Sequence, residues 1–147
     1  MATDGMTSLF AGSDDEALLY ALHRRIQSPR NDAERTFRRV WDAVDLLHSE
    51  TDGIEMLVVD GEPLEDYAAA FDKIGMSQVA AILSRVLGLI SADLRQPQNK
   101  QALVGFLARH RELFTRFTCD FCAACLAFVP IAARYVREHR DDFCEDA

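Results

Sequence analysis

The sequence predicts an all-α protein, a single domain of about six or seven helices. Apolar residues recur at steps of three and four along most of the chain, the spacing of one face of an α-helix. Pro29 and Pro97 interrupt this pattern, and 147 residues are the length of one ordinary domain. We expect a flexible N-terminus at 1–12, the helical domain at 13–140 and an acidic C-terminal tail at 141–147.

The first two helices have the clearest signals. One is expected to begin at Ser13, which forms a capping box with Glu16, and to end before Pro29. A second begins after Asn31, a favoured N-cap residue. Its apolar stripe consists of Phe37, Val40, Trp41, Val44 and Leu47. The run 54–59 lies between two Asp-Gly turns, and its pattern fits a strand and a short helix equally well.

Further helices follow in the second half of the chain. They are expected at 64–73, 77–94, 103–114 and 117–129. The last of these is apolar nearly all round, which predicts a helix at the centre of the fold. Pro130 is expected to kink or restart the helix, and Tyr135 and Val136 belong to the final one, which runs into a polar tail from His139.

Charge and hydropathy restrict the function. The net charge of −8 opposes binding to phosphate backbones and to anionic lipid surfaces, so we expect no direct contact with nucleic acid or membrane. No apolar stretch reaches the roughly 20 residues of a membrane span. Residues 1–10 lack the lysine or arginine of a secretory signal, which predicts a cytoplasmic protein with reduced cysteines.

Cysteines form the one pattern typical of a metal site. Cys119, Cys122 and Cys125 have the C-x2-C-x2-C spacing of part of an iron–sulfur run, with Cys144 as a fourth ligand. The segment has no glycine or proline, and on a helix the three sulfurs spread over about 120° and climb roughly 9 Å. This favours cysteines packed in the core. A metal- or thiol-dependent protein that uses all four remains the alternative.

Motifs of the common enzyme classes are absent. The sequence has no glycine-rich phosphate loop and no nucleophile elbow, and its four histidines form no close pair. We therefore predict no catalytic residue, no metal and no cofactor, which favours a non-enzymatic protein.

Charge is distributed unevenly along the chain. Residues 42–72 contain ten carboxylates and no Lys or Arg, whereas residues 24–41 carry a net charge of +4. These charges either form solvated faces, with some arginines paired to the acids, or create an interaction surface for a basic partner. The residues predicted to bind that partner are Asp52, Glu55, Asp60, Glu62, Glu65 and Asp66.

Three segments carry a family resemblance. Residues 50–57 and 67–76, followed by a long helix, and the final Tyr135…His139…Phe143 pattern resemble a bacterial family of largely unassigned function that includes a DNA-mimic protein. The resemblance implies an all-α fold and a homodimer. For some members it also implies an acidic surface that imitates the phosphate backbone and occupies a DNA-binding protein.

The leading hypothesis is therefore a non-enzymatic interaction protein, in its specific form a DNA mimic, that binds a basic DNA-binding protein. The alternatives are the metal- or thiol-dependent protein described above and a structural dimer of unknown role. A dimer needs an apolar patch. The candidates for it are Phe106, Phe114, Phe117, Phe121 and Phe128.

Overall fold

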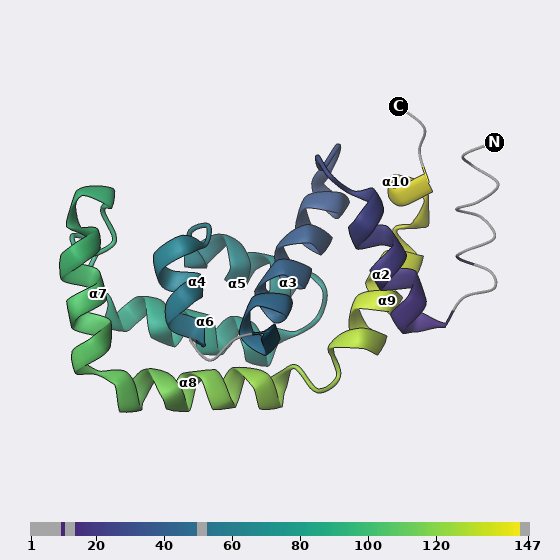
Figure 1. Ribbon diagram of the computed structural model, residues 1–147. Coiled ribbons are helices and arrows are strands. Elements are labelled where there is room, and N and C mark those ends of the chain that lie inside the picture. The colour runs from purple at the N-terminus through teal and green to yellow at the C-terminus, as the bar shows by residue number, and fades with distance from the viewer. Residues whose placement is uncertain (1–9, 11–13, 50–52, 145–147) are drawn as a thin grey trace.

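The protein is built from α-helices (Figure 1). The computed structural model describes Phe10 and residues 14–49 and 53–144, and within these ranges it contains no β-strand. The prediction of an all-α fold is confirmed. In chain order the elements are α2 (Asp15–Arg25), α3 (Asp32–Ser49), α4 (Ile54–Asp60), α5 (Leu64–Lys73), α6 (Ser77–Leu89), the 3-10 turn η1 (Pro97–Asn99), α7 (Lys100–Arg109), α8 (Arg111–Ala124), α9 (Phe128–Glu138) and α10 (Arg140–Cys144).

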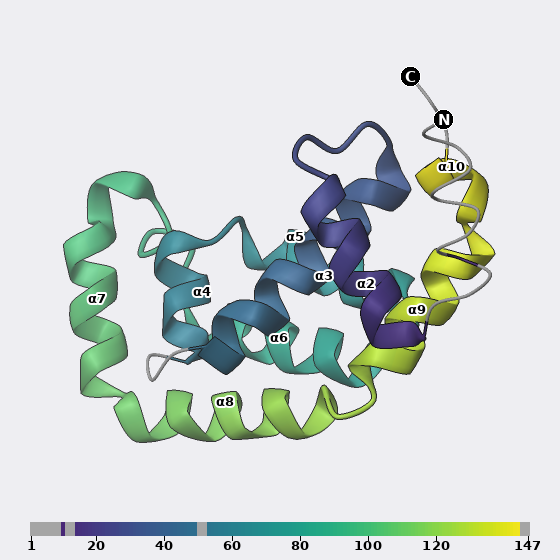
Figure 2. The same cartoon turned by 45° about the vertical axis from the view of Figure 1, so that its right-hand side comes forward.

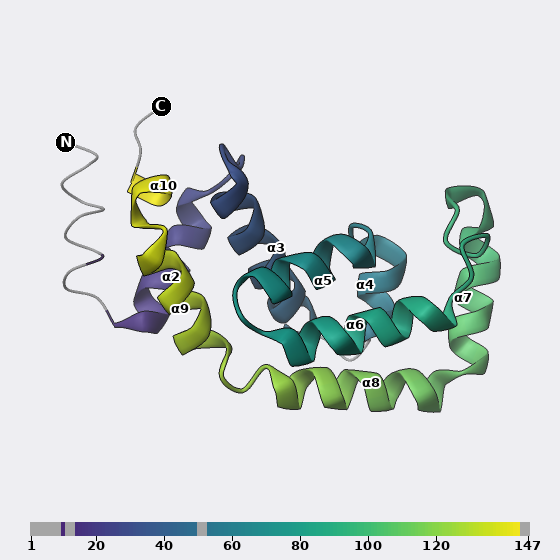
Figure 3. The same cartoon turned by 180° about the vertical axis from the view of Figure 1, so that it is seen from behind.

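Helix α3 lies in the middle of the molecule and joins its two ends (Figures 1 and 2). At one end α2 packs on α9, and α10 packs on both α3 and α9. At the other end α5 packs on α3 and α6, while α4 contacts α3, α7 and α8. Helix α8 runs along one edge beside α6, as the view from behind shows (Figure 3).

Edge-to-face aromatic pairs fill the core at both ends of α3. Phe37 meets Phe143 of α10 with ring centres 5.9 Å apart and planes at 89°. Phe71 of α5 meets Phe121 of α8 at 5.6 Å, also at 89°. All four rings are buried. Such pairs add to the hydrophobic free energy of burial, so each one ties together helices that are distant in the sequence.

Side-chain caps fix the starts of the first two helices. Asn31 caps α3 as predicted, because its Oδ1 accepts a hydrogen bond from the Glu34 backbone N–H at 2.9 Å. Its Nδ2 also donates to the Asp142 carbonyl at 2.9 Å, which ties the cap to α10. For α2 the cap is Asp14, which accepts from Ala17 N–H at 2.8 Å. The predicted cap, Ser13, lies outside the described residues.

The middle segments refine the predicted boundaries. The run 54–59, which fits strand or helix by pattern, is helical and forms α4. The prediction of a helix at 64–73 is confirmed by α5. Helix α6 ends at Leu89, five residues before the predicted end at 94, because the backbone becomes extended at Ile90.

The long apolar region after η1 differs most from the prediction. Residues 103–114 do not form one helix, because the chain bends at His110 between α7 and α8. Helix α8 is amphipathic and lies at an edge, so the prediction of a central helix at 117–129 is wrong. Its aromatic residues share one buried face, whereas Cys119 and Asp120 are exposed and Leu126 after it is 87 % exposed. As predicted, a helix restarts around Pro130. This residue lies in the first turn of α9, where backbone N–H groups have no partner within the helix, so the N–H that proline lacks costs no helical hydrogen bond.

Both ends of the domain carry a buried phenylalanine. The predicted flexible segment 1–12 contains one described residue, Phe10, which is buried. The predicted tail at 141–147 instead begins with the helix α10, in which Phe143 is 1 % exposed. The tail prediction is therefore wrong up to residue 144, because the polar residues around Phe143 conceal a core side chain.

Little apolar surface is left for the predicted dimer patch. Four of its five phenylalanines are buried and the fifth, Phe106, is partly buried against the core, so these rings belong to the domain itself. Among the residues that the structure describes, the exposed large apolar ones come from different helices and loops: Tyr20, Leu89, Val104 and Leu126. Among the described residues no single helix is long and apolar enough to cross a membrane; α8 and α9 pass that test only as a pair bent by 59°.

Candidate functional site

Carboxylates gather where α4 ends and α5 begins. Asp60 is the last residue of α4, Glu62 follows in the turn, and Glu65 and Asp66 occupy the first turn of α5. Acidic side chains interact favourably with the partial positive charge at a helix N-terminus, so Glu65 and Asp66 also stabilise α5. We term these four residues the carboxylate edge.

The carboxylate edge contains four of the six residues predicted to bind a partner. Glu55 lies earlier on α4, where it is partly buried, and it does not line the adjoining pocket. Asp52 lies outside the described residues. The structure therefore brings together the last four of the predicted residues, from Asp60 to Asp66, and places Glu55 apart from them.

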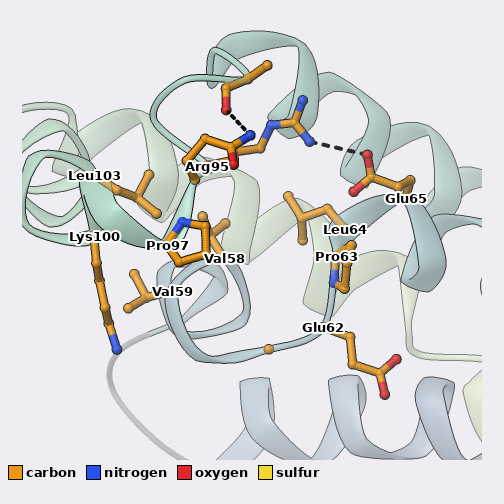
Figure 4. A pocket seen from close by; sticks show the side chains of 13 residues that line it. Val58, Val59, Glu62, Pro63, Leu64, Glu65, Arg95, Pro97, Lys100 and Leu103 are labelled. Carbon is orange, nitrogen blue, oxygen red and sulfur yellow. Dashed lines mark hydrogen bonds and ion pairs between the residues drawn. The ribbon is translucent and has the colours of Figure 1, made fainter.

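A pocket of about 460 Å³ adjoins the carboxylate edge (Figure 4). It lies between α4, the start of α5 and the chain that leads through η1 into α7, and we term it the α4–α7 pocket. Apolar walls come from Val58, Leu64 and Leu103. Its charged side chains are Glu62, Glu65, Arg95 and Lys100. The volume suits a small molecule, but the two acidic and two basic side chains that line the pocket do not favour a ligand of either charge.

Arg39 of α3 holds two carboxylates of the edge. Its Nε donates a 2.7 Å hydrogen bond to Glu62 Oε2, and its Nη2 lies 4.0 Å from Asp66 Oδ2. The hydrogen bond to Glu62 raises the pKa of the Arg39 guanidinium, and the charges of both carboxylates act in the same direction. The interpretation that some arginines of the basic stretch pair with the acids is confirmed for Arg39.

The other two carboxylates pair with cations that follow them in the sequence. Arg95 Nη1 donates to Glu65 Oε2 at 3.2 Å, and Lys100 Nζ donates to Asp60 Oδ1 at 3.3 Å. These partners are 30 and 40 residues away along the chain. Sequence reasoning missed both cations, because no local spacing signals a pair that the fold alone creates.

These ion pairs leave the carboxylates accessible. The side chain of Asp66 is 44 % exposed and that of Glu62 is 52 % exposed, with Asp60 and Glu65 between them. Exposed ion pairs contribute only about 0–1 kcal/mol, because water screens them and the side chains lose rotational freedom. The pairs therefore orient the carboxylates without binding them strongly.

Tyr67 positions the backbone at Glu62. The phenol oxygen of Tyr67 accepts a 3.0 Å hydrogen bond from the Glu62 N–H. Burial raises the pKa of Tyr67, so the phenol stays protonated at neutral pH. Gly61 makes this close approach possible, because a Cβ there would lie 2.9 Å from the phenol oxygen and 2.5 Å from the Leu57 carbonyl oxygen.

The cysteines differ in exposure. Cys119 is exposed and Cys122 partly buried on α8, while Cys125 is buried at its C-terminal end. The core interpretation therefore fits Cys125 and is wrong for Cys119. Within 14–49 and 53–144, no group of three or more His, Cys, Asp or Glu side chains is placed to hold a metal ion. The side chain of Cys144 lies outside the described residues.

Thiol labelling should separate these cysteines. Burial raises the pKa of Cys125 to about 12, so at pH 8 only about one molecule in ten thousand carries the reactive thiolate. We expect a maleimide to modify Cys119 first and Cys125 only after unfolding, as peptide mass mapping would measure. Fast modification of Cys125 in the folded protein would contradict this assignment.

Comparison with family models, with curated proteins and with solved structures gives no match to the chain. The family resemblance therefore rests on the residues quoted for it, and the function has to be argued from the site.

Proposed function

We propose that the protein is non-enzymatic and acts by binding a basic protein through the carboxylate edge. The observation that carries this proposal is the gathering of Asp60, Glu62, Glu65 and Asp66 on one exposed edge. Lysines and arginines of a partner can reach carboxylates placed in this way. In its specific form the proposal is DNA mimicry, in which the partner is a DNA-binding protein and its phosphate-binding residues engage the edge.

Binding proceeds by exchange of ion pairs. Arg39, Arg95 and Lys100 release their carboxylates, at about 0–1 kcal/mol for each exposed pair, and cations of the partner replace them. The net charge of −8 also attracts a basic partner over several ångströms and speeds encounter, an effect that salt screens. Affinity should therefore fall steeply as the salt concentration rises.

The proposal also names the class of partner, the cellular location and the oligomeric state of the protein. The net charge of −8 disfavours direct contact with nucleic acid, so the partner is a protein. The proposal includes a cytoplasmic location, in which the cysteines would stay reduced. The family resemblance implies a homodimer, and we include this oligomeric state in the proposal. Sedimentation in dilute solution would test it, and the mass of a monomer would refute the homodimer.

Neutralising the carboxylate edge should strongly reduce partner capture. The variant Asp60→Asn, Glu62→Gln, Glu65→Gln, Asp66→Asn keeps the side-chain shapes and removes four negative charges. We expect it to capture at least about tenfold less of a basic DNA-binding protein from a lysate of the source cell at low salt. Quantitative mass spectrometry of the captured proteins measures the loss.

A matched variant controls for total charge. Glu112→Gln, Asp120→Asn, Glu138→Gln, Asp141→Asn removes the same charge at exposed positions on α8, α9 and α10. It should capture the partner almost as well as the unaltered protein, with a moderate loss from the weaker overall field. The proposal would be refuted if the unaltered protein and both variants captured equal amounts of the partner. Capture of acidic proteins only would also refute it.

A further inference from the structure

Helices α2, α3 and α9 come together at the end of the molecule away from α7 (Figure 2). A second, smaller pocket is lined by residues of these three helices. Its volume is about 180 Å³, which is less than the roughly 300 Å³ at which small-molecule sites begin. We term it the Trp41 pocket. Its lining residues are Glu16, Leu19, Trp41, Val44, Asp45, Phe128 and Val129. A space of this size suits one side chain.

Aromatic rings give this pocket a fixed shape. Trp41 and Phe128 line it with ring centres 6.5 Å apart. The indole is stacked on His23 at 5.0 Å and tilted against Phe37 at 6.0 Å. Because its neighbours hold the ring in place, a ligand would find the aromatic wall already formed and would lose little free energy in ordering it.

Two carboxylates flank the aromatic wall, one from α2 and one from α3. Glu16 and Asp45 are both exposed, and neither forms an ion pair or hydrogen bond within the described part of the chain. Nearby Asp42 differs, because it pairs with His23 and Arg38 at 3.2 Å. The Trp41 pocket therefore combines apolar walls with two carboxylates that pair with no cation among the described residues, whereas those of the carboxylate edge are paired.

We propose that the Trp41 pocket binds one arginine side chain of the basic partner. The aliphatic stem would lie against Leu19, Val44 and Val129, and the guanidinium would meet the aromatic rings and the two carboxylates. An aromatic face attracts a cation placed within about 6 Å of it, and a planar guanidinium also stacks on such a ring. This inference rests on the proposed function and adds a second contact to it.

Charge and size argue against other occupants. Glu16 and Asp45 would repel a phosphate or carboxylate, and a neutral apolar side chain would leave both charges unused. A second copy of the chain is a further occupant that supplies arginine. The experiment below distinguishes it, because binding to a copy of itself would make the protein a dimer that depends on Glu16 and Asp45.

Titration with N-acetyl-arginine amide tests the pocket directly. Trp41 is the only tryptophan of the chain, so its fluorescence reports occupancy at this position. We expect a saturable change with half-saturation on the order of 1 mM, and no such change with the neutral N-acetyl-citrulline amide. An equal response to both amides would overturn the proposal, because the guanidinium charge would then play no part.

Charge-neutral variants provide the control. Glu16→Gln, Asp45→Asn should weaken binding of the arginine amide about tenfold, whereas Asp93→Asn, Glu112→Gln, with the same charge change at exposed sites elsewhere, should leave it nearly unchanged. Equal weakening in both variants would overturn the proposal. So would a dimer of the unaltered protein that dissociates when Glu16 and Asp45 are neutralised, because the occupant would then be a second copy.

Partner capture separates this proposal from the one it rests on. If Glu16→Gln, Asp45→Asn captures several-fold less partner, the Trp41 pocket contributes to recognition. If it captures as much as the unaltered protein while the variant of the carboxylate edge captures none, the pocket proposal fails and the proposed function stands. Failure of the edge variant to reduce capture refutes the proposed function, whatever the arginine amide shows.

Discussion

Replacing Phe71 with alanine is expected to lower the free energy of unfolding by about 4 kcal/mol, the typical loss for a fully buried phenylalanine. Phe71 has no exposed surface and meets Phe121 edge to face at 5.6 Å. It lies on α5, which packs on α3 and α6, and its ring reaches α8. The substitution would leave a cavity where these helices meet, and urea denaturation measures the loss.

Two further substitutions make the result specific. Phe71→Leu keeps most of the volume and should cost less than about half as much. Tyr20→Ala removes a similar ring that is 57 % exposed, and it should change the free energy of unfolding by less than about 1 kcal/mol. A small loss for Phe71→Ala, comparable to that of Tyr20→Ala, would contradict the packing described for α5 and α8.

Gly53→Ala is expected to lower the free energy of unfolding by about 3 kcal/mol. Gly53 precedes α4 with φ at +66° and ψ at −154°, a conformation that side chains rarely adopt. A Cβ there would lie 2.5 Å from Thr118 Oγ1. That oxygen accepts a hydrogen bond from Ile54 N–H at 3.0 Å and donates to the Phe114 carbonyl, so the hydroxyl cannot move aside without losing both bonds.

Gly88 offers a matched control for this substitution. It lies within α6, and a Cβ there would meet no atom within 4 Å. Gly88→Ala should therefore raise the free energy of unfolding by about 0.5 kcal/mol, because alanine has the higher helix propensity. Urea denaturation of both variants checks the opposite signs. A destabilising Gly88→Ala or a neutral Gly53→Ala would contradict the backbone described at these positions.

Local signals predicted the parts of the fold that local physics determines. Asn31 caps α3 because an amide side chain can accept from the free N–H groups of a first turn, whatever the rest of the protein does. The bounds of α5 follow equally from Pro63 before it and Gly75, with φ at +97°, after it. These positions need no information about distant segments.

Predictions that depend on packing failed for an equally physical reason. The stretch 117–129 contains enough apolar residues for a central helix, but most of it belongs to α8, in which Phe114, Phe117 and Phe121 form the buried face. Composition does not say which side of a helix another helix covers. Phe143 shows the reverse case, because it follows three charged residues, Arg140, Asp141 and Asp142, and yet its side chain is buried against Phe37.

The candidate site was partly predictable. Acidic residues clustered in the sequence do gather where α4 meets α5, since four of them lie within seven positions of the chain. Their partners Arg95 and Lys100 were not predictable, because the fold brings them from 30 and 40 residues away. The Trp41 pocket was also beyond sequence reasoning, since Glu16 and Phe128 come from opposite ends of the chain.

The salt dependence of partner binding tests the central claim most directly. The dissociation constant of the captured basic partner would be measured between 50 mM and 500 mM salt, for the unaltered protein and for the variant with a neutral carboxylate edge. If ion pairs of the edge drive binding, the unaltered protein loses affinity steeply with salt, and the variant binds weakly with a much flatter dependence. Equal affinity and equal salt dependence for both proteins would contradict the claim.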